Sequence, residues 1–266
     1  MSIELEHTAE WAKEGGASGY GGVWIAETAD DPVFPLRIAA ERTSKGELGT
    51  GIAVAFARNP MTTAMQANDL QLASKGRFLL GLGSQIKPHI EKRFSMPWSH
   101  PAPRMRAFVL AIRAIWESWN TGAKLSFEGE FYRHTLMTPF FSPGPNPHGA
   151  PKVFLAGVGI HMTEVAGEVC DGFLVHPFTT ERYLKEVTMP ALQRGMEEGG
   201  RARTDGTFRQ EDQALPRLEV DRPTILGQLY VRHAHRRRGI RVDNRRKRVR
   251  DQAVRHPRPP VRPGSV

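Results

Sequence analysis

The chain has 266 residues, which suits one large domain or two small ones. Its formal net charge of +9 at pH 7 would by itself suggest an anionic partner, but residues 1–203 contain 21 basic and 21 acidic side chains, and residues 204–266 contain 16 basic and 7 acidic ones. Residues 1–203 are therefore neutral overall, and the charge excess belongs to the last quarter of the chain alone.

The first half of the chain alternates helix-like and strand-like segments. An amphipathic helix is predicted from about residue 4 to 17, and apolar strands are predicted at Val23–Glu27, Leu48–Phe56 and Arg77–Gly83. A second helix is expected to follow the Leu48–Phe56 strand, over residues 60–74.

The second half begins with a long amphipathic helix from about Ala102 to Trp119, whose apolar residues recur every three or four positions. Residues 125–137 alternate enough to predict a hairpin outside the main sheet, and a proline-rich loop follows. The remaining predicted elements are a strand at Lys152–Gly157, a helix from about Met162, a strand at Gly172–Pro177 and a helix over residues 180–198.

Strands that read as continuous apolar runs and are followed by helices predict a parallel sheet that is buried on both faces. The spacing allows either a β/α barrel or an open, doubly wound sheet. Several strands run into small or polar residues at their carboxyl ends, where both architectures bind ligands. Neither GLGS nor GVG completes a dinucleotide-binding fingerprint, and no Cys/His spacing predicts a metal site.

Four blocks read GYGGVWIAETADDPVFPL, ELGTGIAVAFARNPMTTA, GRFLLGLGSQIKPHIEKRF and KVFLAGVGIHMTEVAGEVCDGFLVHPF. In this order they resemble the bacterial luciferase-like monooxygenase superfamily, and within it the coenzyme F420-dependent oxidoreductases of actinobacteria. The resemblance covers about residues 5–200. It implies a (β/α)8 barrel that holds F420 and transfers a hydride between the deazaflavin and a small organic substrate. The alternative that it leaves open is an FMN-dependent monooxygenase.

The resemblance also implies roles for individual residues at the strand ends. Glu27 is expected to be catalytic, and Thr28 to face the cofactor beside it. Gly51 and Ile52 fall where relatives hold a non-prolyl cis peptide against the cofactor ring. The remaining expected cofactor contacts are Ala53, Gly83, Ala156, Gly157, Gly159 and His176, the last near the position where relatives contact phosphate.

One stretch departs from the family pattern. Some sugar-phosphate dehydrogenases of the family carry a catalytic glutamate just after the fourth strand, where this chain reads GSQIKPHI. Gln85 and Ile86 cannot transfer a proton, which puts that substrate chemistry in doubt.

The two ends of the chain do not fit the family barrel. We expect a partial barrel over residues 1–203 that lacks the first, seventh and eighth family strands. Residues 204–266 hold fifteen arginines and one lysine without apolar periodicity, which predicts a tail that is disordered or read out of frame. Whether such a chain is active stays open, and the alternatives of another class are a basic nucleic-acid-binding protein and a non-functional gene remnant.

The same features set the expectations for location and partners. The first residues show no signal peptide, no window reaches the roughly 18 apolar residues of a membrane span, and the single Cys170 fits a reducing compartment. We therefore expect a cytoplasmic protein with a small-molecule substrate and no membrane contact. Nucleic acid is not favoured as a partner, and a homodimer is kept as an option if the barrel folds.

Overall fold

The computed structural model describes residues 7–17, 21–176 and 178–201. The chain divides into two units, residues 1–233 and 234–266, and all described residues belong to the first. The predicted tail at residues 204–266, with its expected disorder, lies outside the described residues, as does the start of the predicted N-terminal helix.

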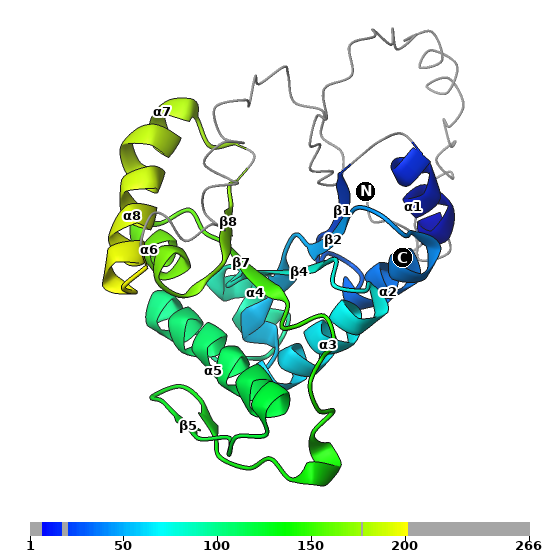
Figure 1. The fold of residues 1–266 in the computed structure, drawn as a ribbon. Helices are drawn as coiled ribbons and strands as arrows, with labels where there is room; N and C mark the ends of the chain where they lie inside the picture. The colour runs from blue at the N-terminus through cyan, green and yellow to red at the C-terminus, as the bar shows by residue number, and fades with distance from the viewer. Residues whose placement is uncertain (1–6, 18–20, 177, 202–266) are drawn as a thin grey trace, which may run out of the picture. The chain divides into compact units, whose positions relative to one another are not determined.

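A parallel sheet forms the centre of the described part (Figure 1). Its strand order is β1-β2-β4-β7-β8, with β3 paired to β4 beyond the end of β2. The strands are β1 (Gly22–Ile25), β2 (Glu47–Thr50), β3 (Ala53–Val54), β4 (Phe78–Gly83), β7 (Lys152–Ala156) and β8 (Gly172–Leu174). Within the described residues β1 and β8 are the two edges and the sheet does not close, so the predicted α/β fold of an incomplete barrel is confirmed.

Helices follow the strands and cover one face of this sheet (Figure 1). They are α1 (Thr8–Ala17), α2 (Val33–Arg42), α3 (Pro60–Ala73), α4 (Lys87–Lys92), α5 (Pro101–Thr121), α6 (Ile160–Val169), α7 (Glu181–Tyr183) and α8 (Met189–Glu198), with short 3-10 turns at Ala55–Ala57 and Pro139–Phe141 and a π-helical turn at Leu184–Thr188. The apolar residues predicted to repeat along the long helix, Phe108 to Trp119, are all buried in α5.

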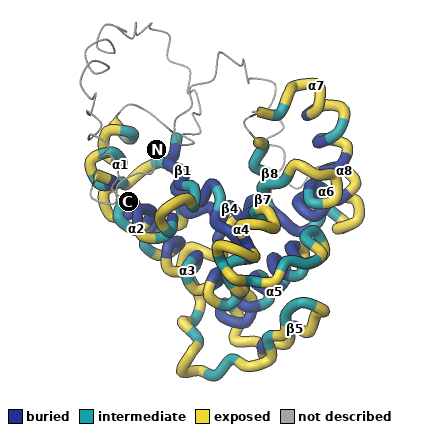
Figure 2. Tube along the Cα trace, turned by 180° about the vertical axis from the view of Figure 1, so that it is seen from behind, coloured by how far each residue is buried: buried dark blue, intermediate teal, exposed yellow. Residues whose placement is uncertain are grey.

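The two faces of the sheet bury different residues because successive side chains of a strand point to opposite sides. Val23, Leu80 and Leu155 belong to the large core beneath the helices. The opposite face carries a smaller cluster, in which Trp24 and Phe154 meet edge to face at 5.9 Å. Most strand residues of the main sheet are consequently buried, whereas the outer helix faces and many loops are exposed (Figure 2).

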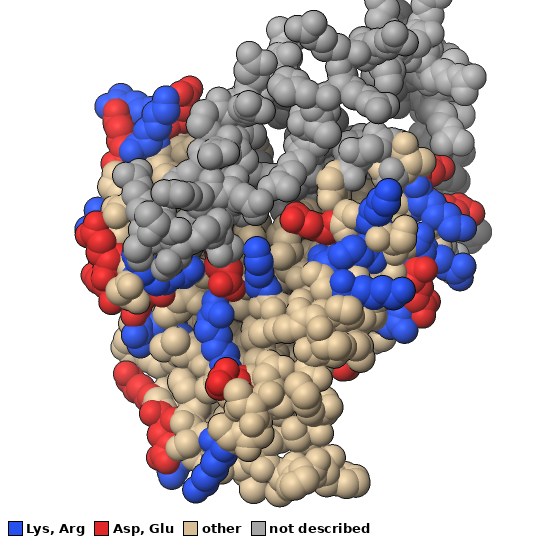
Figure 3. Space-filling view, in the orientation of Figure 1, with Lys and Arg blue, Asp and Glu red and all other residues tan. Residues whose placement is uncertain are grey.

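The predicted hairpin is present as the antiparallel pair β5 (Phe127–Glu128) and β6 (Arg133–His134), separate from the main sheet. The loop that follows, residues 135–151, contains no lysine, arginine, aspartate or glutamate. It coincides with the uncharged region at the lower right of Figure 3, whereas basic and acidic side chains lie among each other over the rest of the described surface on that face.

Candidate active site at the carboxyl ends of the strands

All residues predicted from the resemblance fall at or just beyond the carboxyl ends of the parallel strands. Glu27 and Thr28 follow β1, Gly51 and Ile52 separate β2 from β3, and Gly83 ends β4. Farther along the same edge lie Ala156, Gly157 and Gly159 after β7, and His176 after β8. Because the strands are parallel, these positions lie at the same end of the sheet, where the strands terminate. This end is called the carboxyl edge below, and the end where the strands begin is the opposite, amino-terminal edge.

The predicted second strand, Leu48–Phe56, is interrupted in the structure. Its first part is β2 and its second part β3, and between them the Gly51–Ile52 peptide is cis, which confirms the prediction for that bond. On one side of the interruption Thr50 replaces the regular main-chain pairing with its side chain. The Thr50 hydroxyl donates to the carbonyl of Gly81 at 2.6 Å and accepts from the amide of Gly81 at 2.9 Å.

Glu27 acts in the same way on the other side of the interruption. Its backbone amide donates to the carbonyl of Ile52 at 3.0 Å, and its carboxylate Oε2 accepts from the amide of Val54 at 2.7 Å. Val54 is fully buried and β1 has already ended, so this amide is paired by the carboxylate and not by a neighbouring strand. Glu27 therefore holds the segment after the cis peptide at two points.

Arg58 completes this arrangement from the short connection between the 3-10 turn Ala55–Ala57 and α3. Its Nη1 donates to Glu27 Oε2 at 2.5 Å and to the carbonyl of Val54 at 3.1 Å, and its Nη2 donates to Asp31 Oδ2 at 2.6 Å. Arg58 directly precedes Asn59, whose side chain caps α3 by accepting from the amide of Thr62. The cap of α3 thus fixes the backbone next to Arg58, from which the guanidinium reaches Glu27 and Asp31.

The Glu27–Arg58 ion pair is largely buried, with 7% of the Glu27 side chain and 12% of the Arg58 side chain exposed. Burial alone would lower the pKa of Arg58, but hydrogen bonds to and charges on Glu27 and Asp31 outweigh it and raise that pKa. The guanidinium therefore stays charged, as a buried carboxylate requires of its partner.

The neighbouring predicted residues contact β4 and the end of α4. Ile52 lies over the end of β4, where a Cβ on Gly83 would come within 2.9 Å of Ile52 Cδ1. Ala53 is buried and pairs with Leu82. The carbonyl of Thr28 accepts from Arg93, which ties the end of α4 to the segment after β1.

The remaining predicted residues form a second group along the edge. Gly159 begins α6 without a side-chain cap, and a Cβ placed on it would meet no described atom within 4 Å. The carbonyl of Val158 accepts from Tyr183 Oη at 3.0 Å, which joins the turn after β7 to α7. His176 Nδ1 accepts from the amide of Phe178 at 3.3 Å. This group follows β7 and β8, whereas Glu27 follows β1 at the other end of the strand order.

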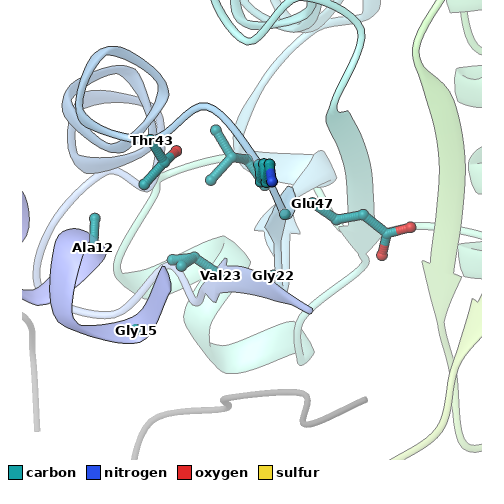
Figure 4. A pocket seen from close by; sticks show the side chains of 9 residues that line it. Ala12, Gly15, Gly22, Val23, Thr43 and Glu47 are labelled. Carbon is teal, nitrogen blue, oxygen red and sulfur yellow. The ribbon is translucent and has the colours of Figure 1, made fainter. Parts of the chain in front are cut away.

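A small pocket lies at the opposite edge of the sheet (Figure 4). Its lining comes from α1, the connection between α2 and β2, and the amino-terminal ends of β1 and β2: Ala12, Gly15, Gly22, Val23, Thr43, Lys45, Gly46, Glu47 and Leu48. Parallel β/α folds bind their ligands at the carboxyl ends of the strands, so we place the candidate site at the other edge. The described residues contain no cluster of three or more histidine, cysteine or acidic side chains placed to hold a metal, and none of their helices is long and apolar enough to cross a membrane.

Three residues of this site were not predicted from the sequence: Thr50, Asp31 and Arg58. Thr50 and Asp31 sit in stretches where a polar residue is ordinary. Arg58 could have been predicted as a site residue, because it is a charged residue between the apolar run Ala53–Ala57 and the helix start at Asn59-Pro60.

Comparison with known proteins agrees with this architecture. An uncharacterized protein of Mycobacterium tuberculosis is 58% identical over 201 residues, 76% of this chain and 59% of that protein. The F420-dependent glucose-6-phosphate dehydrogenase of Nakamurella multipartita is 26% identical over 198 residues, 74% of this chain and 53% of that enzyme. The chain thus spans less than two thirds of the length of these relatives.

Among solved structures, an F420-dependent secondary alcohol dehydrogenase in complex with an F420-acetone adduct superposes with a TM-score of 0.66 at 19% identity. The superposition covers 76% of this chain and 63% of that enzyme, and it supports the fold. The family model described as luciferase-like monooxygenase matches residues 1–211. With that match and the strand-end site on one parallel sheet, the chain belongs to the luciferase-like monooxygenase family, whose members are F420- or flavin-dependent oxidoreductases.

Proposed function

We propose that this chain is an F420-dependent oxidoreductase that transfers a hydride between the deazaflavin and a small organic substrate. The observation that carries the proposal is the common edge on which Glu27, Gly51–Ile52, Gly83, Ala156–Gly159 and His176 lie. The F420-dependent relative, aligned over 74% of the chain, supports the choice of cofactor. When bound, F420 supplies the hydride acceptor or donor, and the chain's residues bind and orient it.

The residues at this edge fit a flat ring with an anionic side chain. The segment Gly51–Ile52 offers main chain and one aliphatic side chain for a ring to rest against, and it is held in place by Glu27. Gly159 leaves open space at the start of α6, where uncapped helix amides favour an anionic group. Thr28 and His176, at the two ends of this line, complete the proposed contacts.

The substrate proposed for this chain differs from the glucose 6-phosphate of that relative. Just after β4, Gln85 adopts a left-handed backbone conformation, and its side-chain oxygen accepts from the amide of Ile86 at 3.1 Å. An amide at this position cannot donate or accept a proton as a carboxyl group can. This supports a small organic substrate other than a sugar phosphate.

The test is an equilibrium titration of the purified full chain with F420 and, separately, with FMN. We expect saturable binding of F420. We also expect Gly159→Val, which fills the open space at α6, to weaken that binding by at least about tenfold. The matched control is Lys45→Val at the opposite edge of the sheet, beside the pocket in Figure 4, which should leave binding unchanged.

The outcomes separate the candidates. Preferential binding of FMN would replace the proposal with the FMN-dependent monooxygenase, the alternative that the family resemblance left open. A folded chain that binds neither cofactor would remove the enzyme proposal for this chain. Equal weakening by both valine substitutions would place the site elsewhere.

A further inference from the structure

The interruption between β2 and β3 leaves main-chain groups of Val54 that the sheet pairs only in part. On the side of β4 the register continues, with Ala53 opposite Leu82 and Val54 opposite Gly83. On the side of β1 there is no strand left, because β1 ends at Ile25. The amide of Val54 is instead bound by Glu27 and its carbonyl by Arg58, so two side chains do the work of the missing strand.

Two donors occupy Oε2 of the Glu27 carboxylate and hold this side chain in one orientation. Oε2 accepts from both Val54 and Arg58, and 93% of the side chain is shielded from solvent, since 7% is exposed. A group that exchanges protons with a substrate must reach it, whereas Oε2 of Glu27 is bound to the Val54 amide and to Arg58 within a largely buried pair.

We propose that Glu27 and Arg58 are a pair of positioning residues, which fix the Ile52–Val54 segment so that the cofactor ring can be seated against it. The proposal rests on the proposed function, because it takes the cofactor edge as given. It assigns Glu27 a role that differs from the catalytic one expected from the family resemblance. Asp31 supports the pair by holding the second guanidinium nitrogen of Arg58 at 2.6 Å.

The chain contains a matched control for this pair at the opposite edge of the sheet. Asp171 Oδ2 accepts from the amide of Val153 at 2.7 Å and from Arg113 Nη2 at 2.9 Å, and Arg113 Nε donates to the carbonyl of Val169 at 3.0 Å. This pair has the same chemistry, a carboxylate shared between a strand amide and an arginine. It lies where β7 and β8 begin, away from the proposed cofactor edge.

The experiment compares Glu27→Gln, Arg58→Met and their double variant with Asp171→Asn and Arg113→Met in the full chain. Each is titrated with F420, and its thermal midpoint is measured. If the first pair positions the cofactor segment, each single variant should raise the Kd for F420 by about tenfold or more. Because the two residues act together, the Kd of the double variant should not exceed the higher of the two single-variant Kd values. The Asp171 and Arg113 variants should lower the thermal midpoint and leave the Kd unchanged.

A second readout needs no cofactor. Amide hydrogen exchange of a peptide covering residues 50–57 should become faster in Glu27→Gln and stay unchanged in Asp171→Asn, because only the first substitution loosens the Val54 amide. Arg58→Lys, which keeps the charge but not the forked donors, should lie between wild type and Arg58→Met in both measurements.

The inference is overturned if the Glu27 and Arg58 variants bind F420 as wild type does, or if exchange of residues 50–57 does not change in Glu27→Gln. A Glu27→Gln variant that keeps its Kd but loses one limb of the pH-rate profile would show proton transfer instead of positioning. A wild-type chain that binds no cofactor would remove the proposed function, and this outcome is distinct because it does not depend on any variant.

Discussion

At the scale of single residues, the cofactor edge is built by side chains that substitute for a strand. Thr50 pairs both main-chain groups of Gly81, and Glu27 with Arg58 pairs those of Val54. All of these groups are buried or nearly so, and a buried main-chain group without a partner is costly. In an uninterrupted sheet, a neighbouring strand would pair these main-chain groups whatever its side chains. Where the strand is interrupted, the hydrogen bonds depend on the particular side chains of Thr50, Glu27 and Arg58.

Thr50 allows a direct test of this point. Thr50→Val keeps the shape but removes the hydroxyl, so that the amide and carbonyl of Gly81 both lose a partner in a site only 1% exposed. We expect the free energy of unfolding to fall by about 2–4 kcal/mol, measured by denaturant unfolding. Thr50→Ser keeps the hydroxyl and should cost only about 1 kcal/mol for the lost methyl group. Equal losses in the two variants would contradict the hydrogen-bonding role.

Cys170 is the single cysteine of the chain and lies fully buried after α6. Burial raises the pKa of its thiol to about 12, so at pH 8 both access and thiolate are lacking. We expect dithionitrobenzoate to leave the native chain unlabelled and to react with one thiol per chain after denaturation, followed by absorbance. Rapid labelling of the native chain would show that this part of the core opens readily.

At the scale of elements, α6 and α8 pack at main-chain distance. A Cβ on Gly195 would lie 1.9 Å from the carbonyl oxygen of Glu164, and one on Gly167 would lie 2.2 Å from that of Leu192. Glycine within a helix is ordinarily unfavourable, so these two residues are explained by the close approach of the helices that they permit.

Gly195→Ala tests whether packing or helix propensity decides here. Alanine should stabilise an isolated helix by about 1 kcal/mol, but the clash with Glu164 should make the variant less stable by about 1–3 kcal/mol overall. Glu197→Ala, on the exposed side of the same helix, is the control and should change stability by less than about 0.5 kcal/mol. Thermal and denaturant unfolding measure both, and a stabilising Gly195→Ala would contradict the close contact.

Long and strongly patterned elements were predictable from the sequence. The α5 helix and the β4 and β7 strands agree with their predicted ranges to within a few residues, because burial on one helix face or on both strand faces leaves a clear apolar pattern. The helices α2 and α4 were not predicted. Pro35 obscures the pattern of the first, and the second spans only residues 87–92.

The candidate site was predictable only in part. Gly51 and Ile52 could be located through the family resemblance, but their sequence alone reads as an unbroken strand. The pairing of Glu27 with Arg58 joins residues 31 positions apart, and no local pattern encodes such a contact. The π-helical turn at Leu184–Thr188 inside the predicted helix 180–198 was missed for a similar reason, since its residues are ordinary helix formers.

At the scale of the whole described sheet, function depends on parallel strands that bring distant segments to one edge. Residues from 27 to 176 lie there because β1, β2, β4, β7 and β8 run parallel, although long connections separate these strands in the sequence. The other edge holds the pocket of Figure 4, built from residues without the strand-end pattern. A cofactor bound at the carboxyl ends of the strands would support the proposed site, and a cofactor bound in the pocket at their amino-terminal ends would contradict it.

The most direct test of the account is a crystal structure of the chain soaked with F420. We predict density for the ring against Gly51–Ile52 and for its side chain along Ala156–Gly159, with the Glu27–Arg58 pair intact behind the ring. Cofactor density at the amino-terminal edge, among the residues of Figure 4, would contradict the account, as would an occupied carboxyl edge in which Glu27 has left Arg58 to contact the ring.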